Sequence, residues 1–216
     1  MATHTTRSTI IMTLLFGALL TPFLPEAEAT TAVRPSFTTT TKTAEAQQPI
    51  FAGAADEAAY MWTEDLFSAA GFEVPVAGIE FHRNMEACGG VRGRTYFSDE
   101  ALATVVVCAT HENPMVEEAW RRRTLLHELA HAWIDQNTAA EDIEAFTELR
   151  GLDEWSSRDV NWEQRATEHA AEIFMWGIQQ GDYKVDFRID DTSCEALSAG
   201  YELLTGVTIS CEIASD

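Results

Sequence analysis

The chain has 216 residues, of which 46% are hydrophobic, and its formal net charge is −21. This length supports one domain with a substantial core. So acidic a surface repels nucleic-acid phosphates and anionic lipids, so we expect no nucleic-acid partner and no membrane partner after signal removal.

The first 29 residues have the pattern of a secretory signal peptide. Arg7 gives a short basic start, residues 10–20 form an apolar run, and residues 27–29 read Ala-Glu-Ala, which fits a cleavage site. The apolar run is shorter than the about 20 residues that a membrane span needs. We therefore expect the mature chain to be secreted to the extracellular space.

Residues 30–49 are rich in Thr, Ala and Pro, which predicts a disordered tether or a removable pro-segment. The folded domain is expected to cover residues 50–216. It opens with an amphipathic helix over residues 54–70 that Gly71 ends. The hydrophobic period then changes toward two, which predicts strands. Their expected bounds are residues 78–82, 93–97 and 104–109.

The four cysteines agree with export, because they form an even set without a C-x-x-C pair. This pattern favours disulfides over a structural zinc site. Sequence allows three pairings, and we prefer Cys88–Cys108 and Cys194–Cys211 because each pair brackets a plausible hairpin or helix–turn unit. Each bond would close a loop of about 20 residues, worth roughly 3 kcal/mol in the chain-entropy model.

The most informative feature is the pentad from His127 to His131, which reads H-E-L-A-H inside a helix predicted over residues 114–136. Two imidazoles four positions apart face one side of a helix. Their ring nitrogens can reach one Zn²⁺ at about 2.0–2.1 Å. Glu128 can then take a proton from a metal-activated water. Ordinary surface histidines are the alternative interpretation, which the glutamate at the second position makes less favourable.

A catalytic zinc needs a third protein ligand, and the pentad helix offers no further histidine at a suitable spacing. A second helix, predicted over residues 160–181, carries Glu168 and Glu172 one turn apart on a single face. We assign Glu168 as the third ligand, with His169 as its competitor. Glu172 is expected to accept a hydrogen bond that fixes the tautomer and orientation of one ligating histidine, preferably His127.

H-E-x-x-H followed on a later helix by E-x-x-A-E resembles the gluzincin metallopeptidases, the thermolysin-like branch of the zincins. The similar stretch covers about residues 81–181, and it is similar to a group of small secreted bacterial proteins with HELAHAW and a Trp-rich connector. In that family the two histidines and the first later glutamate bind zinc, and the pentad glutamate is the base. The resemblance implies these roles for His127, His131, Glu168 and Glu128.

The expected fold is α+β and zincin-like, with a small mixed sheet packed on the active-site helix and a mostly helical C-terminal part. In zincins one edge strand accepts the extended substrate backbone, and the sequence does not identify that strand. Val105–Val107 could equally be buried on both faces. Further helices are expected over residues 140–149 and 192–204, the latter capped by Asp191 or Thr192, with a short stretch at residues 183–187.

The expected activity is zinc-dependent hydrolysis of a peptide or protein substrate. The sequence does not reveal the oligomeric state, although a monomer is favoured. The group that stabilises the oxyanion stays open among Tyr183, Tyr201, His111 and Arg165. Trp155 and Trp162 are expected to be lid or core packing residues. Two alternatives remain: a secreted zinc-binding interaction module without turnover, and a zinc hydrolase that acts on a non-peptide or cell-wall amide.

Overall fold

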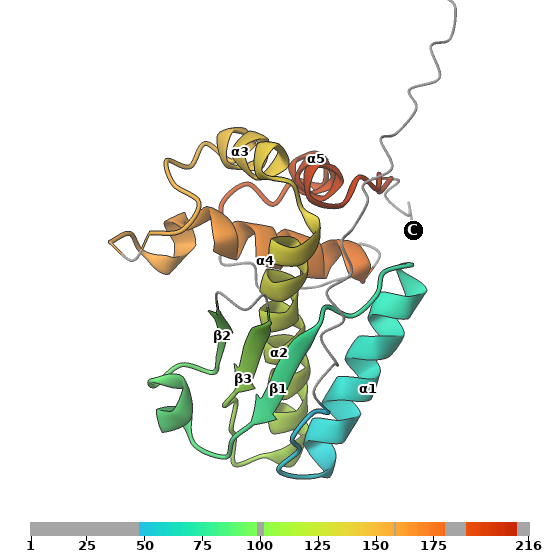
Figure 1. The fold of residues 1–216 in the computed structure, drawn as a ribbon, viewed down its shortest axis with the longest axis vertical. Coiled ribbons are helices and arrows are strands. Elements are labelled where there is room, and N and C mark those ends of the chain that lie inside the picture. The colour runs from blue at the N-terminus through green and yellow to red at the C-terminus, as the bar shows by residue number, and fades with distance from the viewer. Residues whose placement is uncertain (1–47, 99–101, 158, 180–188, 211–216) are drawn as a thin grey trace, which may run out of the picture. The chain divides into compact units, whose positions relative to one another are not determined.

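The computed structural model describes residues 48–98, 102–157, 159–179 and 189–210. Within these ranges the chain is α+β, as predicted, with one three-stranded mixed sheet and five α-helices (Figure 1). The elements in chain order are α1 (Ala54–Ala69), β1 (Ala77–Phe81), η1 (Met85–Cys88, a 3-10 turn), β2 (Gly93–Phe97), β3 (Ala103–Val107), α2 (Pro114–Asn137), α3 (Ala140–Leu149), η2 (Trp162–Gln164, also 3-10), α4 (Ala166–Ile178) and α5 (Cys194–Thr205).

The sheet has the order β1-β3-β2, with β1 parallel and β2 antiparallel to the central β3. Val105, Val106 and Val107 of β3 are all buried. Val105 and Val107 belong to the main core with the helices, whereas Val106 packs with Cys88 and Cys108. The possibility that this strand is buried on both faces is therefore confirmed, and β2 is left as an edge strand among the described residues.

The predicted disulfide Cys88–Cys108 is present and links η1 to the end of β3. The other predicted pair includes Cys211, which lies outside the described residues. No helix in the described ranges has both the length and the apolar character that a bilayer span requires.

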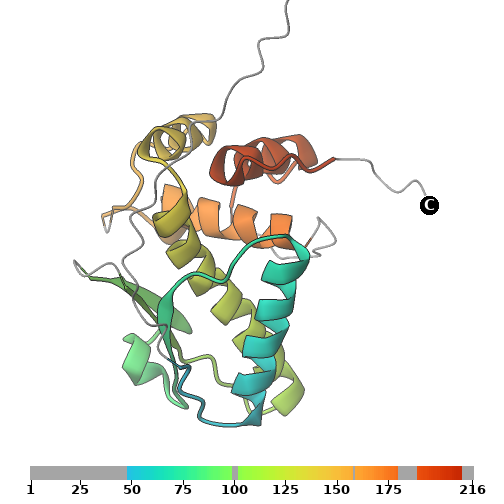
Figure 2. The same ribbon diagram turned by 45° about the vertical axis from the view of Figure 1, so that its right-hand side comes forward.

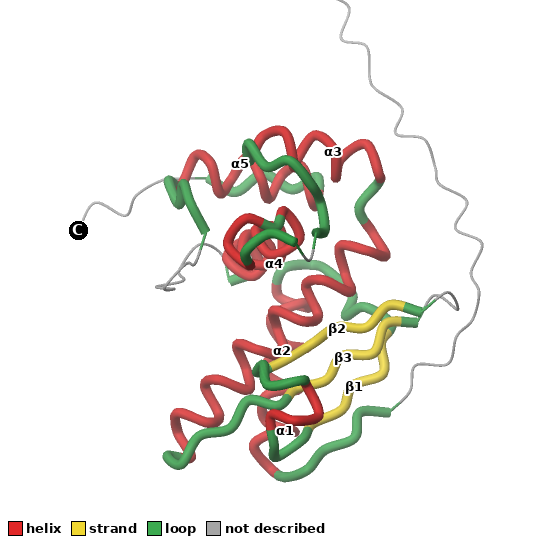
Figure 3. Tube along the Cα trace, turned by 90° about the vertical axis from the view of Figure 1, so that its left-hand side faces the viewer, coloured by secondary structure: helices red, strands yellow, loops and turns green. Residues whose placement is uncertain are grey.

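The long helix α2 is the element on which the other parts pack. Its start follows local rules: Pro114 is in the first turn, and the Asn113 side chain accepts the Met115 N–H. The strands lie along one side of α2, α1 lies beside it, and α4 crosses it near its C-terminal half (Figures 2 and 3). Leu125 and Leu129 are fully buried in the resulting core.

One buried ion pair joins α1 to α2. Arg121 of α2 has its side chain only 1% exposed, and its Nη1 contacts Asp56 Oδ1, whose side chain is 2% exposed. The guanidinium also donates to Glu117 Oε1 at 3.0 Å and to the His82 carbonyl at 3.1 Å. The second oxygen of Asp56 accepts the Ala52 N–H at 2.7 Å. Two helices, the residue after β1 and the segment before α1 therefore meet at one buried ion pair.

Two predicted helix starts were wrong. Helix α4 begins at Ala166 and not near residue 160, because Arg165 is extended (φ −90°, ψ 124°) and its guanidinium donates back to the Val160 carbonyl. Helix α5 begins at Cys194 and not at residue 192. Its capping residue is Ser193, whereas Asp191 or Thr192 was predicted. The predicted stretch at residues 183–187 lies outside the described residues.

Candidate metal centre

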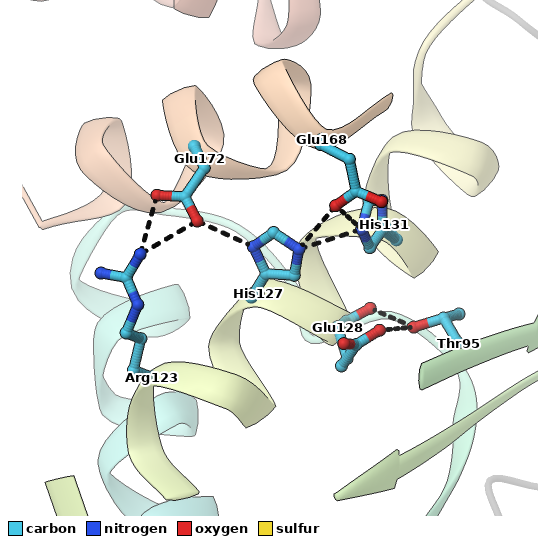
Figure 4. A network of polar contacts seen from close by, with 7 residues as sticks. All are labelled: Thr95, Arg123, His127, Glu128, His131, Glu168 and Glu172. Atoms are coloured by element: carbon cyan, nitrogen blue, oxygen red, sulfur yellow. Dashed lines mark hydrogen bonds and ion pairs between the residues drawn. The ribbon is translucent and has the colours of Figure 1, made fainter. Parts of the chain in front are cut away.

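Three side chains from two helices converge on one point (Figure 4). His127 and His131 lie one turn apart on α2, and Glu168 lies in the first turn of α4. Glu168 Oε2 is 3.0 Å from His127 Nε2 and 3.3 Å from His131 Nε2, and the two Nε2 atoms are 3.2 Å apart. In the described part of the chain, this is the one group of three such side chains placed to hold a metal ion.

The triangle of donor atoms fits a tetrahedral cation. Ligand atoms about 2.0–2.1 Å from a tetrahedral centre are about 3.3 Å from one another. The observed separations of 3.0–3.3 Å match this value, so a single ion above the triangle could bond all three atoms. Two imidazoles and a carboxylate suit zinc and other first-row transition metals.

The imidazoles and carboxylates of this cluster stabilise one another's charged forms. Burial alone lowers the pKa of His127, but hydrogen bonds to Glu168 and Glu172 outweigh it and raise the pKa to about 10. Burial would raise the pKa of Glu168, whereas the two imidazoles hold it well below its usual range. A divalent cation would replace the imidazole proton, so metal binding should release protons and weaken as the pH falls.

Glu172 lies one turn after Glu168 and contacts the other nitrogen of His127. Its Oε1 is 3.2 Å from His127 Nδ1, and its side chain is 2% exposed. A carboxylate at Nδ1 favours the tautomer that leaves Nε2 free for a metal. The role predicted for Glu172, which is to orient the ring of His127, requires this placement.

Glu128 is held beside the cluster by β2. The Thr95 hydroxyl lies 2.8 Å from Glu128 Oε2 and 2.9 Å from the Glu128 carbonyl oxygen. A Cβ on Gly93 would lie 2.8 Å from Glu128 Oε1 and 2.4 Å from Thr124 Cγ2. Gly93 therefore allows the strand to approach the helix closely. Sequence reasoning missed Thr95 and Gly93, although their alternation in β2 places them on one face.

An open cleft of about 620 Å³ runs past the three candidate ligands and Glu128. A second cavity of about 390 Å³ shares part of its wall, including Trp162. The Trp162 ring is stacked over His127 at a centroid distance of 6.0 Å, whereas Trp155 packs against Phe146. Both tryptophans pack against the main core, and Trp162 also forms part of the cleft wall.

His169, the competing ligand, faces away from the cluster. It is buried, its Nε2 lies 2.8 Å from the Glu163 carbonyl, and its Nδ1 accepts from Arg150 Nε at 3.3 Å. Burial lowers the pKa of His169, which fits a neutral ring with one donor and one acceptor nitrogen. Both nitrogens are engaged in joining η2 to α3, so the geometry favours Glu168 as the third ligand.

The four candidates for the oxyanion donor differ in where they lie relative to the cleft. Arg165 lines the cleft. Tyr201 is buried against α4, where a Cβ on Gly177 would overlap its ring. His111 packs edge-on against Trp120. Tyr183 lies outside the described residues. Of the described candidates, Arg165 is the one at the cleft.

Replacing Glu168 with Ala should weaken zinc binding by about 10-fold or more, because even outer partners of ligating histidines are worth 10–100-fold in metal affinity. The measurement is competition with a chromophoric chelator. Glu163→Ala is the matched control, since this carboxylate is exposed in the preceding turn. Equal zinc affinity in wild type and Glu168→Ala would remove Glu168 from the site.

Comparison of the chain with protein-family models, curated proteins and solved structures finds no match. The resemblance to the gluzincins therefore stays an expectation based on the pentad and the later glutamates.

Proposed function

We propose that this protein is a secreted, gluzincin-type zinc metallopeptidase with a zincin-like fold. The observation that supports this best is the convergence of His127, His131 and Glu168 within 3.0–3.3 Å, beside Glu128 and an open cleft. A purely structural zinc site is usually closed by four protein ligands and needs no neighbouring base. The Cys88–Cys108 disulfide suits an oxidising compartment such as the extracellular space.

In the proposed reaction, His127, His131 and Glu168 would hold a zinc ion, which would supply a Lewis acid for the scissile carbonyl and for a water molecule. Glu128 accepts one proton of that water, whose oxygen adds to the carbonyl carbon. Glu128 then passes the proton to the amide nitrogen as the C–N bond breaks and the amine departs. Thr95 keeps the Glu128 carboxylate in place through their 2.8 Å contact. Arg165 lines the same cleft and is the described candidate for stabilising the oxyanion.

The position of β2 supports an extended peptide as the substrate. This strand forms one wall of the cleft and is an edge strand among the described residues. The Arg92 carbonyl accepts the Cys108 N–H, so in an antiparallel ladder the backbone groups of Gly93, Thr95 and Phe97 point away from β3. These groups can pair with an added strand, which is how extended peptides bind sheet edges. A small amide would make no use of this edge.

A cleavage survey tests the proposal against its two alternatives. Zinc-loaded wild-type protein is incubated with a diverse peptide library and, separately, with cell-wall fragments, and products are identified by mass spectrometry. We expect peptide cleavage that stops with a chelator and returns with added zinc. Cleavage of cell-wall fragments alone would favour the other hydrolase. Tight zinc binding without cleavage of any substrate would favour the interaction module.

A further inference from the structure

A third side chain of α2, Arg123, lies one turn before His127 and contacts the same glutamate. Arg123 Nη2 is 3.1 Å from both oxygens of Glu172. Glu172 Oε1 in turn lies 3.2 Å from His127 Nδ1 (Figure 4). The Glu172 side chain is 2% exposed and that of Arg123 is 32% exposed. The partly exposed guanidinium of Arg123 is thus connected through the buried carboxylate of Glu172 to His127, a candidate metal ligand.

The contacts form a ladder between two helices. Arg123, His127 and His131 follow one another at four-residue spacing on α2, and Glu172 and Glu168 do so on α4 in the opposite order. Each carboxylate lies between two α2 side chains: Glu172 between Arg123 and His127, and Glu168 between His127 and His131. At the end of the ladder farthest from His131, Glu172 is therefore paired with Arg123, which is not a candidate metal ligand.

We propose that Arg123 is a positioning residue for the metal centre, acting through Glu172 to fix the ring of His127. This inference rests on the metal centre of the proposed function. Both carboxylate oxygens lie 3.1 Å from the same guanidinium nitrogen, Nη2, and this charge-assisted contact holds Glu172 with its Oε1 beside His127 Nδ1. A carboxylate held by the imidazole alone would be free to turn. His127 Nε2 would then be less well directed at the metal.

The test measures zinc affinity by chelator competition, in the absence of any substrate. We expect Arg123→Met to bind zinc about 10-fold more weakly than wild type, at the lower end of the 10–100-fold cost of losing an outer partner. Arg123→Lys keeps the charge but replaces the planar guanidinium with an ammonium group on a different side chain, so its zinc affinity should fall between those of wild type and Arg123→Met. The adjacent Arg122 pairs with Glu118 on another face of α2, which makes Arg122→Met the matched control with unchanged affinity.

A double-mutant cycle shows whether Arg123 acts through Glu172. In a Glu172→Gln background the Arg123→Met change should cause no further loss of zinc affinity, because the shared partner is already altered. Denaturant unfolding of the metal-free variants shows whether a substitution also lowers the stability of the fold, apart from its effect on zinc affinity. The visible spectrum of the Co²⁺-substituted protein should change in Arg123→Met and stay unchanged in Arg122→Met, which reports on ligand geometry.

Equal zinc affinity in Arg123→Met and wild type would overturn the inference, as would an equal loss in the Glu172→Gln background. Failure of the proposed function has a different signature. A chain that binds zinc with the expected order of affinities but cleaves no peptide would overturn the peptidase assignment alone. A wild-type chain that binds no zinc would overturn both.

Discussion

Glu128→Gln should lower the rate of peptide hydrolysis by roughly 10²–10⁴-fold, the contribution of a positioned general base. Gln has nearly the same shape as Glu and can keep a contact with the Thr95 hydroxyl, but it cannot accept the proton of the attacking water. The ligands His127, His131 and Glu168 are unchanged. We therefore expect zinc content to remain that of the wild type. The measurement is the hydrolysis rate of a cleaved peptide, with zinc determined on the same samples.

The matched control is Glu118→Gln, which makes the same chemical change on the same helix at a carboxylate that is 40% exposed and paired with Arg122. It should hydrolyse peptides at the wild-type rate. A Glu128→Gln protein that keeps both its zinc and its activity would show that Glu128 is not the base. Loss of zinc in this variant would instead assign Glu128 a role in binding the metal.

Asp56→Ala should lower the free energy of unfolding by about 3–5 kcal/mol, the usual cost of removing one partner from a buried ion pair. Arg121 would keep its contacts with Glu117 and the His82 carbonyl. The substitution would nevertheless leave the buried Arg121 guanidinium, at the contact between α1 and α2, without its main counter-charge. Denaturant unfolding of the metal-free protein measures this difference without a contribution from metal binding.

A neighbouring ion pair on the same helix provides the control. Arg122 and Glu118 are 35% and 40% exposed, so Glu118→Ala should cost less than about 1 kcal/mol. Exchanging both buried partners, Asp56→Ala with Arg121→Met, should recover part of the lost stability, because no buried charge then remains unpaired at this contact. If Asp56→Ala and Glu118→Ala were equally stable, the buried pair would have no special role in the α1–α2 contact.

The elements with strong local signals could be predicted from the sequence. The bounds of β2 and α3 agree with prediction, and α2 differs by one residue, because turn residues, capping residues and hydrophobic period mark their ends. The start of α4 could not be predicted in this way. Residues before Ala166 have a helical composition, but Arg165 is extended and bonds back to Val160. A contact between side chain and backbone of this kind leaves no periodic signal.

In the candidate site, too, only the contacts set by local spacing could be predicted from the sequence. The two histidines share a helix face by spacing alone, so their proximity follows from the helix period. The contact of Glu168 with them depends on how α4 crosses α2, which is tertiary. The prediction could only name the acidic side chains of a second helix, and the family resemblance implied the same residue. Thr95 and Arg123 were not predicted, because the position of β2 over α2 and the partner of an arginine on a helix depend on packing that no local pattern encodes.

The disulfide has a consequence for the cleft that follows from the order of the chain. Cys88 and Cys108 are 20 positions apart, and β2 lies between them, so the strand that carries Gly93 and Thr95 is part of a covalently closed ring. A newly made chain, still holding both thiols, lacks this ring and has only noncovalent contacts to keep that wall beside Glu128. Maturation of the cleft would then be tied to the redox state of the surroundings, and would be completed only where thiols are oxidised.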